Sequence, residues 1–219
     1  MVFECHEKKQ STNRRIEKSA IYLWCLLLFL VQSFPLLGVG NTTFTVHMLQ
    51  QTATYFLVPI LILLGLTDSL LKPLYNHRVG SRLITVFTKP GVALILFNII
   101  FSIYYVPFVF EVIIRHPLYQ AGAFLLLFPL AFMMWWPVVS PAKNGTTLQP
   151  LLRIVYIAGI GVLLTPIGIY IIFSGELLSS TYLLRDQQVG GVAWKMITVA
   201  IYIMMIGHSL SEAVKEDKL

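Results

Sequence analysis

Charged residues are scarce in this chain, and they are nearly absent from its long apolar stretches. Of its 219 residues, 12% are charged and 57% are hydrophobic, whereas about 25% of the residues of a soluble domain are charged. Water is therefore not the main solvent of this chain. The few polar residues inside the apolar stretches gather toward one side of the expected membrane, and that side is where we look for function.

The usual signatures of catalysis are also missing. The sequence has no GxSxG, HExxH or P-loop motif and no paired carboxylates within an apolar stretch, so we expect no enzyme. The two cysteines fall in the first tail and in the first apolar stretch, at Cys5 and Cys25. Neither is placed to form an external disulfide or a CxxC metal site.

Six apolar stretches are each long enough to cross a bilayer, whose core needs about 20 helical residues. They lie near residues 20–37, 44–67, 91–112, 119–139, 154–173 and 190–207. They are apolar on every face, unlike the alternating strands of a barrel, and helices satisfy their own backbone groups in lipid. The sequence predicts an all-α membrane helix bundle in one domain, residues 20–208, between tails at 1–19 and 209–219.

The basic residues predict the orientation, because Lys and Arg are retained on the cytoplasmic side. Thirteen of the 16 fall in the two tails and the second and fourth loops, which places both termini in the cytoplasm. The other side has Arg115 and Arg185, and Lys195 lies within the sixth stretch, where we expect it to snorkel outward. This asymmetry explains the net charge of +6 and gives no reason to expect nucleic acid.

The first stretch could be a cleaved signal peptide, since it follows a basic head and precedes small residues. The long basic head favours an uncleaved anchor instead.

A polar stripe occupies the outer end of the second stretch. Its residues are spaced for one helical face: His47, Gln50, Gln51, Thr54 and Tyr55. One interpretation is interhelical hydrogen bonding by Gln and Thr. The other is that His47 and Met48 are soft ligands suited to Cu(I), although Met48 points about 100° away from His47, so that neighbouring helices would have to help.

The third stretch carries a second stripe, Asn98, Ser102 and Tyr105, which we expect to face the first. Beyond it, Glu111 and Arg115 are spaced for an ion pair on one helix. His116 precedes Pro117 and marks the expected helix end. It is either an interfacial or capping residue or a second metal ligand on the outer side.

The loop before the last stretch ends in Arg185, Asp186, Gln187 and Gln188. Asp186 near a helix N-terminus is explained by the helix dipole, and the alternative is a docking or metal-binding element above the second and third stretches. Trp135 and Trp136 are expected as anchors at the inner interface.

Proline lies within or at the end of five stretches, at Pro35, Pro59, Pro107, Pro129 and Pro166. Each can kink its helix, so we expect a bent bundle with room for a cavity.

Four segments of the chain, in order, resemble the bacterial CtaG family of cytochrome c oxidase assembly factors, of the multi-pass membrane type. The segments, within residues 47–207, read HMLQQTATYFLVPILILLGL, KPGVALILFNIIFSIYYVP, HPLYQAGAFLLLFPLAFMMWWPVVSP and LLRDQQVGGVAWKM. The resemblance implies a protein of the bacterial cell membrane that helps a haem-copper oxidase to mature, at the stage when copper enters. Its implied partners are membrane lipid, oxidase subunits and copper chaperones.

The resemblance matches the outer histidine of the family to His47 and the HP of its outer loop to His116 and Pro117. It matches the segment that begins the last span to residues 186–191. Many members carry further histidines where this chain has Gln51 and Ala123 or Phe124. The expected metal ligands for Cu(I) are thus His47, Met48, Gln51 and His116. A metal-free scaffold that binds an oxidase subunit and a small-solute transporter are the alternative functions.

Overall fold

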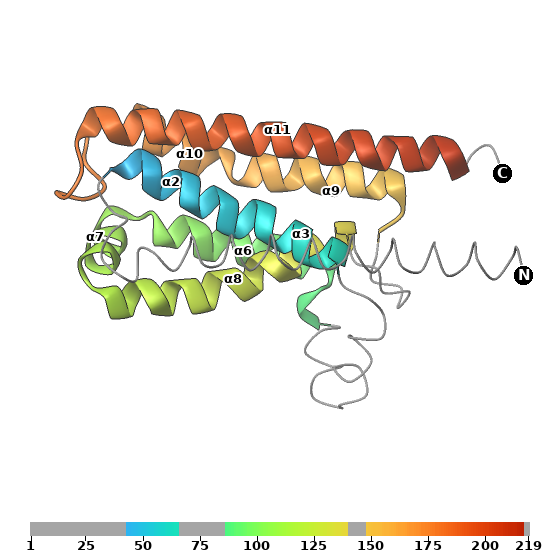
Figure 1. Ribbon diagram of the computed structural model, residues 1–219, viewed down its shortest axis with the longest axis horizontal. Coiled ribbons are helices and arrows are strands. Elements are labelled where there is room, and N and C mark those ends of the chain that lie inside the picture. The colour runs from blue at the N-terminus through green and yellow to red at the C-terminus, as the bar shows by residue number, and fades with distance from the viewer. Residues whose placement is uncertain (1–42, 66–85, 140–147, 217–219) are drawn as a thin grey trace, which may run out of the picture.

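The computed structural model describes residues 43–65, 86–139 and 148–216, and these residues are helical apart from short connections (Figure 1). The expected first span, most of the basic loops and the ends of both tails lie outside the described residues. The helices are α2 (Phe44–Thr52), the π-helix η2 (Ala53–Leu57), α3 (Val58–Gly65), α6 (Pro90–Tyr104), α7 (Pro107–Arg115), α8 (Pro117–Val139), α9 (Pro150–Leu163), α10 (Thr165–Phe173) and α11 (Leu184–Glu216).

The prediction of an all-α membrane helix bundle is confirmed. Among the described residues, four helical segments are long and apolar enough to cross a bilayer: Phe44–Gly65, Pro117–Val139, Pro150–Phe173 and Leu184–Lys215. The pair α6 and α7 would be a fifth span, but it is bent by 75°. The count of six spans and the side on which the termini lie stay predictions.

The long helices run side by side in two groups (Figure 1). The helix α11 packs against α2, α9 and α10, while α8 packs against α3, α6 and α7. The short helix α7 lies across one end of the bundle. We call this end the α7 end; it comprises α7, the loop 174–183 and the first turns of α2, α8 and α11.

The prolines explain where the helices bend. Val106 has extended backbone angles, φ −66° and ψ 129°, because the residue before a proline is kept out of the helical region by the ring of Pro107. The chain therefore turns sharply between α6 and α7. Similarly, α9 ends just before Pro166, the second residue of α10.

The π-helix η2 lies just before Pro59, which interrupts the hydrogen bonding of the helix. Pro59 has no N–H to donate to the carbonyl of Tyr55, four residues earlier, and a freed carbonyl is costly inside a membrane. The indole Nε1 of Trp135 on α8 donates to this carbonyl at 3.1 Å. Trp135 is fully buried and Trp136 is 2% exposed, so the expectation of interfacial anchors was wrong for both.

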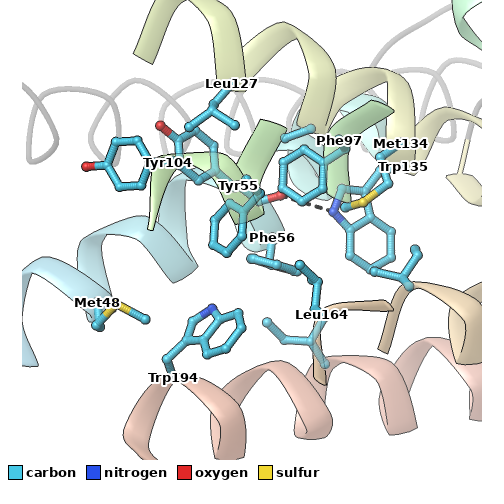
Figure 2. Packing of buried hydrophobic residues seen from close by; sticks show 14 of the residues in the cluster. Met48, Tyr55, Phe56, Phe97, Tyr104, Leu127, Met134, Trp135, Leu164 and Trp194 are labelled. Carbon is cyan, nitrogen blue, oxygen red and sulfur yellow. Dashed lines mark hydrogen bonds between the residues drawn. The ribbon is translucent and has the colours of Figure 1, made fainter. Parts of the chain in front are cut away.

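Aromatic rings fill the space between the two groups of helices (Figure 2). Phe101 stacks on Trp194 of α11 with ring centroids 5.8 Å apart, and Phe56 meets Trp135 edge-on at 6.4 Å. In lipid the hydrophobic effect does not drive helices together, so such close packing holds the bundle.

Candidate functional site at the α7 end

A buried polar cluster lies just inside the α7 end, and it is formed by residues of α2 and of the last turn of α6. We call it the His47 cluster: His47, Met48, Gln51, Tyr104 and Tyr105. All five side chains are at most 9% exposed. The short α2 places His47 and Gln51 one above the other, because they are four residues apart.

Tyr104 joins the two polar residues of α2. Its hydroxyl lies 3.4 Å from Nε2 of His47 and accepts a hydrogen bond from Nε2 of Gln51 at 3.4 Å. The rings of His47 and Tyr104 are nearly parallel, at an angle of 5° and a centroid distance of 6.2 Å. The other amide atom of Gln51, Oε1, is buried and has no hydrogen-bond partner among the described residues.

The sulfur of Met48 is bound by the neighbouring tyrosine. The hydroxyl of Tyr105 donates to Sδ of Met48 at 3.2 Å, and the two tyrosine rings meet edge-on at 4.9 Å. The two soft atoms of α2, the imidazole nitrogen of His47 and the thioether sulfur of Met48, are thus each within reach of one tyrosine hydroxyl.

Aromatic rings from the α7 end close the cluster. His47 meets Phe110 of α7 edge-on at 5.4 Å and is tilted toward Phe44 at 6.1 Å. Tyr182 of the loop 174–183 covers Phe44 at 5.5 Å. Burial, together with the nearby carboxylate of Asp186, raises the pKa of Tyr182 to about 12, so this phenol is neutral at ordinary pH. The cluster is therefore enclosed by aromatic rings, and the phenol that covers it carries no charge.

A charged patch ties α7 to the loop 174–183. Glu111 forms the expected ion pair with Arg115 and also accepts hydrogen bonds from the backbone N–H and the hydroxyl of Ser180, at 3.0 and 2.9 Å. Hydrogen bonds from Ser179, then from Ser180 and Arg115, lower the pKa of Glu111 to about 2. The patch holds the loop over the end of the bundle.

Asp186 links the first turns of two helices. Its carboxylate accepts from the N–H groups of Phe44 and Thr45 and from the hydroxyl of Thr45 at 2.6 Å. These N–H groups begin α2 and have no partner within that helix. Asp186 itself lies in the first turn of α11, where a negative charge is also favoured. The expected dipole interaction is therefore present, and it extends to a second helix.

The rest of the segment around Asp186 also has structural contacts. Gln187, which is fully buried, accepts from the N–H of Leu178 at 2.8 Å and donates to the carbonyl of Glu176 at 3.2 Å. A Cβ atom on Gly190 would lie 2.9 Å from Cα of Thr45, and the segment therefore needs glycine for the close approach of α11 to α2.

The structure does not bring every expected residue to this cluster. His116 is exposed in the turn between α7 and α8, with its ring against Tyr119 at 5.3 Å. Asn98 is buried and donates to the carbonyl of Leu94. Gln50 and Ser102 are partly buried beside the cluster on their helices, while Tyr55 lies deeper, against Phe97 and Phe101.

Tyr104 was missed by the sequence interpretation, which chose Tyr105 from the spacing of the second stripe. The helix α6 ends at Tyr104 because of Pro107, so both tyrosines turn toward α2. The pair Tyr104–Tyr105 directly before a proline was the available signal.

A cavity of about 390 Å³ adjoins the cluster between α6, α7 and α8. Its lining is apolar, and it includes Tyr104, Gly122 and Ala123. Ala123 is one of the positions at which the family resemblance led us to look for a further histidine. The described residues contain no group of three or more His, Cys, Asp or Glu side chains that could hold a metal ion, so any metal held here would rely on His47 and Met48.

No curated protein and no solved structure matches the chain. A family described as cytochrome c oxidase caa3 assembly factor (Caa3_CtaG) matches residues 5–216, nearly the whole chain. The protein therefore belongs to the family of cytochrome c oxidase caa3 assembly factors.

Proposed function

We propose that this assembly factor works in a bacterial cell membrane and helps copper to enter the oxidase, with its α7 end facing the outside. The observation that carries the proposal is that His47 and Met48 are both buried in the cluster at that end, each beside a tyrosine hydroxyl. Imidazole nitrogen and thioether sulfur are the neutral, soft donors that suit Cu(I).

The arrangement fits a Cu(I) ion that is transferred to a partner better than an ion that is held permanently. Two soft donors from this chain leave room for ligands from a partner, and each donor now has a tyrosine hydroxyl close to it. Rotation of Tyr104 and Tyr105 would release both donors without leaving a charge in the membrane. Cu(I) would then exchange these donors for the ligands of the oxidase or of a copper chaperone.

The test is the substitution His47→Gln, which keeps a polar side chain in the cluster, combined with Met48→Leu, which keeps the volume. We expect lower copper content and lower activity per oxidase molecule in membranes, with recovery on added copper. His208→Ala is the matched control, because His208 is exposed and lies 24 residues after Leu184, the first residue of α11, which begins at the α7 end. Wild-type copper content in the double variant, at a normal level of the protein, would refute the ligand role.

A metal-free scaffold is the second candidate, and the closure of the cluster favours it. His47 is 5% exposed and surrounded by aromatic rings, which is also the environment of a residue that only holds helices together. This function predicts stable co-purification with an oxidase subunit and no affinity for Cu(I) in the purified protein. The expected result for His47→Gln is then a change in stability without a change in oxidase copper.

A further inference from the structure

Lys195 lies about a third of the way along α11, and no carboxylate of the described residues forms an ion pair with it. It lies eleven residues after Leu184, the first residue of α11, which corresponds to about 16 Å along the helix axis. This is about half the thickness of the hydrocarbon core. Ionisable residues at this depth are rare and usually have a functional partner.

The side chain turns to a neighbouring helix and away from the α7 end. The stem of Lys195 passes Gly168, where its Cδ would lie 3.7 Å from an added Cβ. The ammonium then donates to the hydroxyl of Thr165 at 2.9 Å, and Thr165 is one turn farther from the α7 end than Gly168. If the α7 end faces the outside, as the basic residues predict, Lys195 turns inward rather than snorkelling outward.

The break between α9 and α10 gives the ammonium partial stabilisation. Thr165 donates in turn to the carbonyl of Gly161 at 2.7 Å, near the C-terminal end of α9, where the helix dipole favours a cation. An ammonium has three hydrogens to donate, and Thr165 is its one hydrogen-bond partner in the part of the chain that the structure describes. The remaining donors are available to another group.

The described residues bring no carboxylate to Lys195. Its six apolar stretches contain a single acidic residue, Glu111, and Glu111 is engaged by Arg115 and Ser180 at the α7 end. No described residue supplies a counter-charge to Lys195, so we look for one on a partner protein.

We propose that the face of α11 around Lys195 docks a transmembrane helix of an oxidase subunit that carries an Asp or Glu near the middle of its span. This inference rests on the assembly role and names the surface and the chemistry of the contact. Val192 and Val199, three residues before and four after Lys195, lie on the same face and are 47% and 38% exposed. A partner helix would cover these apolar side chains and bring its carboxylate to the ammonium.

The first experiment tests the charge. Lys195→Met keeps most of the stem and removes the ammonium, and we expect the protein to retain about thirtyfold less oxidase subunit on co-purification, because breaking a buried charge pair weakens binding strongly. Lys195→Arg keeps the charge and should retain most of the binding. Equal co-purification with Lys195→Met and the wild type would overturn the proposal.

Thr165→Val separates docking from a purely structural role. It removes the one partner of Lys195 within the described chain and leaves the ammonium in place. We expect lower stability in this variant but retained binding of the subunit. If Thr165→Val and Lys195→Met lose binding equally, Lys195 acts only through α9 and α10, and the proposal fails.

The second experiment tests the surface by photocrosslinking in membranes. A photoreactive residue at Val192 should capture an oxidase subunit, whereas one at Leu125 of α8, which is 71% exposed, should not. Capture at Leu125 instead would refute the proposed face. Loss of oxidase activity in a strain that lacks the protein tests the assembly role separately: if activity is lost there but Lys195→Met restores it fully, only the docking proposal fails.

Discussion

The substitution Asp186→Ala tests whether the carboxylate between α2 and α11 anchors the α7 end. It removes the acceptor of the N–H groups of Phe44 and Thr45 and of the hydroxyl of Thr45. Thr43 is the N-cap of α2, and Asp186 satisfies the next two N–H groups, so their loss should cost as much as the loss of an N-cap, about 1 to 2 kcal/mol. Loss of a negative charge near the first turns of two helices adds about 1 kcal/mol. We therefore expect a destabilisation of about 2 to 3 kcal/mol.

The assay is reversible unfolding of the purified protein in mixed micelles, followed by circular dichroism. Asp186→Asn keeps an acceptor and loses the charge, so its effect should be about half as large. Gln188→Ala is the matched control in the same turn, because Gln188 makes only a long hydrogen bond of 3.5 Å to the carbonyl of Ser174. We expect its effect to be below about 0.5 kcal/mol.

Unchanged stability of Asp186→Ala would refute the anchoring role. If that variant also lost oxidase activity at normal stability and normal protein level, the docking or metal-binding interpretation of Asp186 would replace it.

Three further predictions concern the close packing at Gly190, the hydrogen bond to the carbonyl of Tyr55 and the pH dependence due to Glu111. Gly190→Ala should destabilise by about 1 to 3 kcal/mol, measured by thermal unfolding in detergent, because its Cβ would meet the backbone of Thr45 at 2.9 Å. Trp135→Phe should cost about 1 to 2 kcal/mol in the same assay, since the carbonyl of Tyr55 loses its donor; a neutral result would show that another group replaces the indole. The low pKa of Glu111 stabilises the fold above about pH 4.5, its ordinary value, and this contribution should vanish as the pH falls toward 2. Glu111→Gln should therefore unfold with a flatter pH dependence over this range, and equal pH profiles for the variant and the wild type would contradict the assignment.

Much of the fold could be predicted from the sequence because the solvent leaves few alternatives. An apolar run of about 20 residues has to be helical in lipid, and the five runs that the structure describes are helical. The third and fifth runs are each divided into two helices, and α11 extends well beyond the expected residues 190–207. Pro107 also predicted a bend, since it fixes its own backbone and restricts Val106. The direction of the bend, which sends α7 across the end of the bundle, depends on packing against α8 and could not be predicted from spacing.

The candidate site was predictable only in part. Helical spacing shows which residues share a face of one helix, but it does not show which residues of another helix pack against that face. The stripe of α2 led to His47 and Gln51, and the structure places both beside tyrosines of α6. Tyr104 was missed because regular spacing does not hold at a helix end. Trp135 was misplaced because its hydrogen-bond partner depends on a carbonyl that Pro59 frees on another helix.

The cost of an unsatisfied polar group in hydrocarbon divides the polar residues of this chain into two kinds. Asp186 and Gln187 are fully engaged by α2 and by the loop 174–183, so their chemistry is already used in holding the fold. Gln51 keeps a buried oxygen without a described partner, and Lys195 keeps a charge without a carboxylate among the described residues. The segment at the start of α11 that carries the family resemblance is thus explained by packing. Other buried groups also lack a described partner, among them Asn98 Oδ1 and Trp194 Nε1; Gln51 and Lys195 differ from these because one lies in the His47 cluster and the other carries a charge, and we expect cargo and partner at these two places.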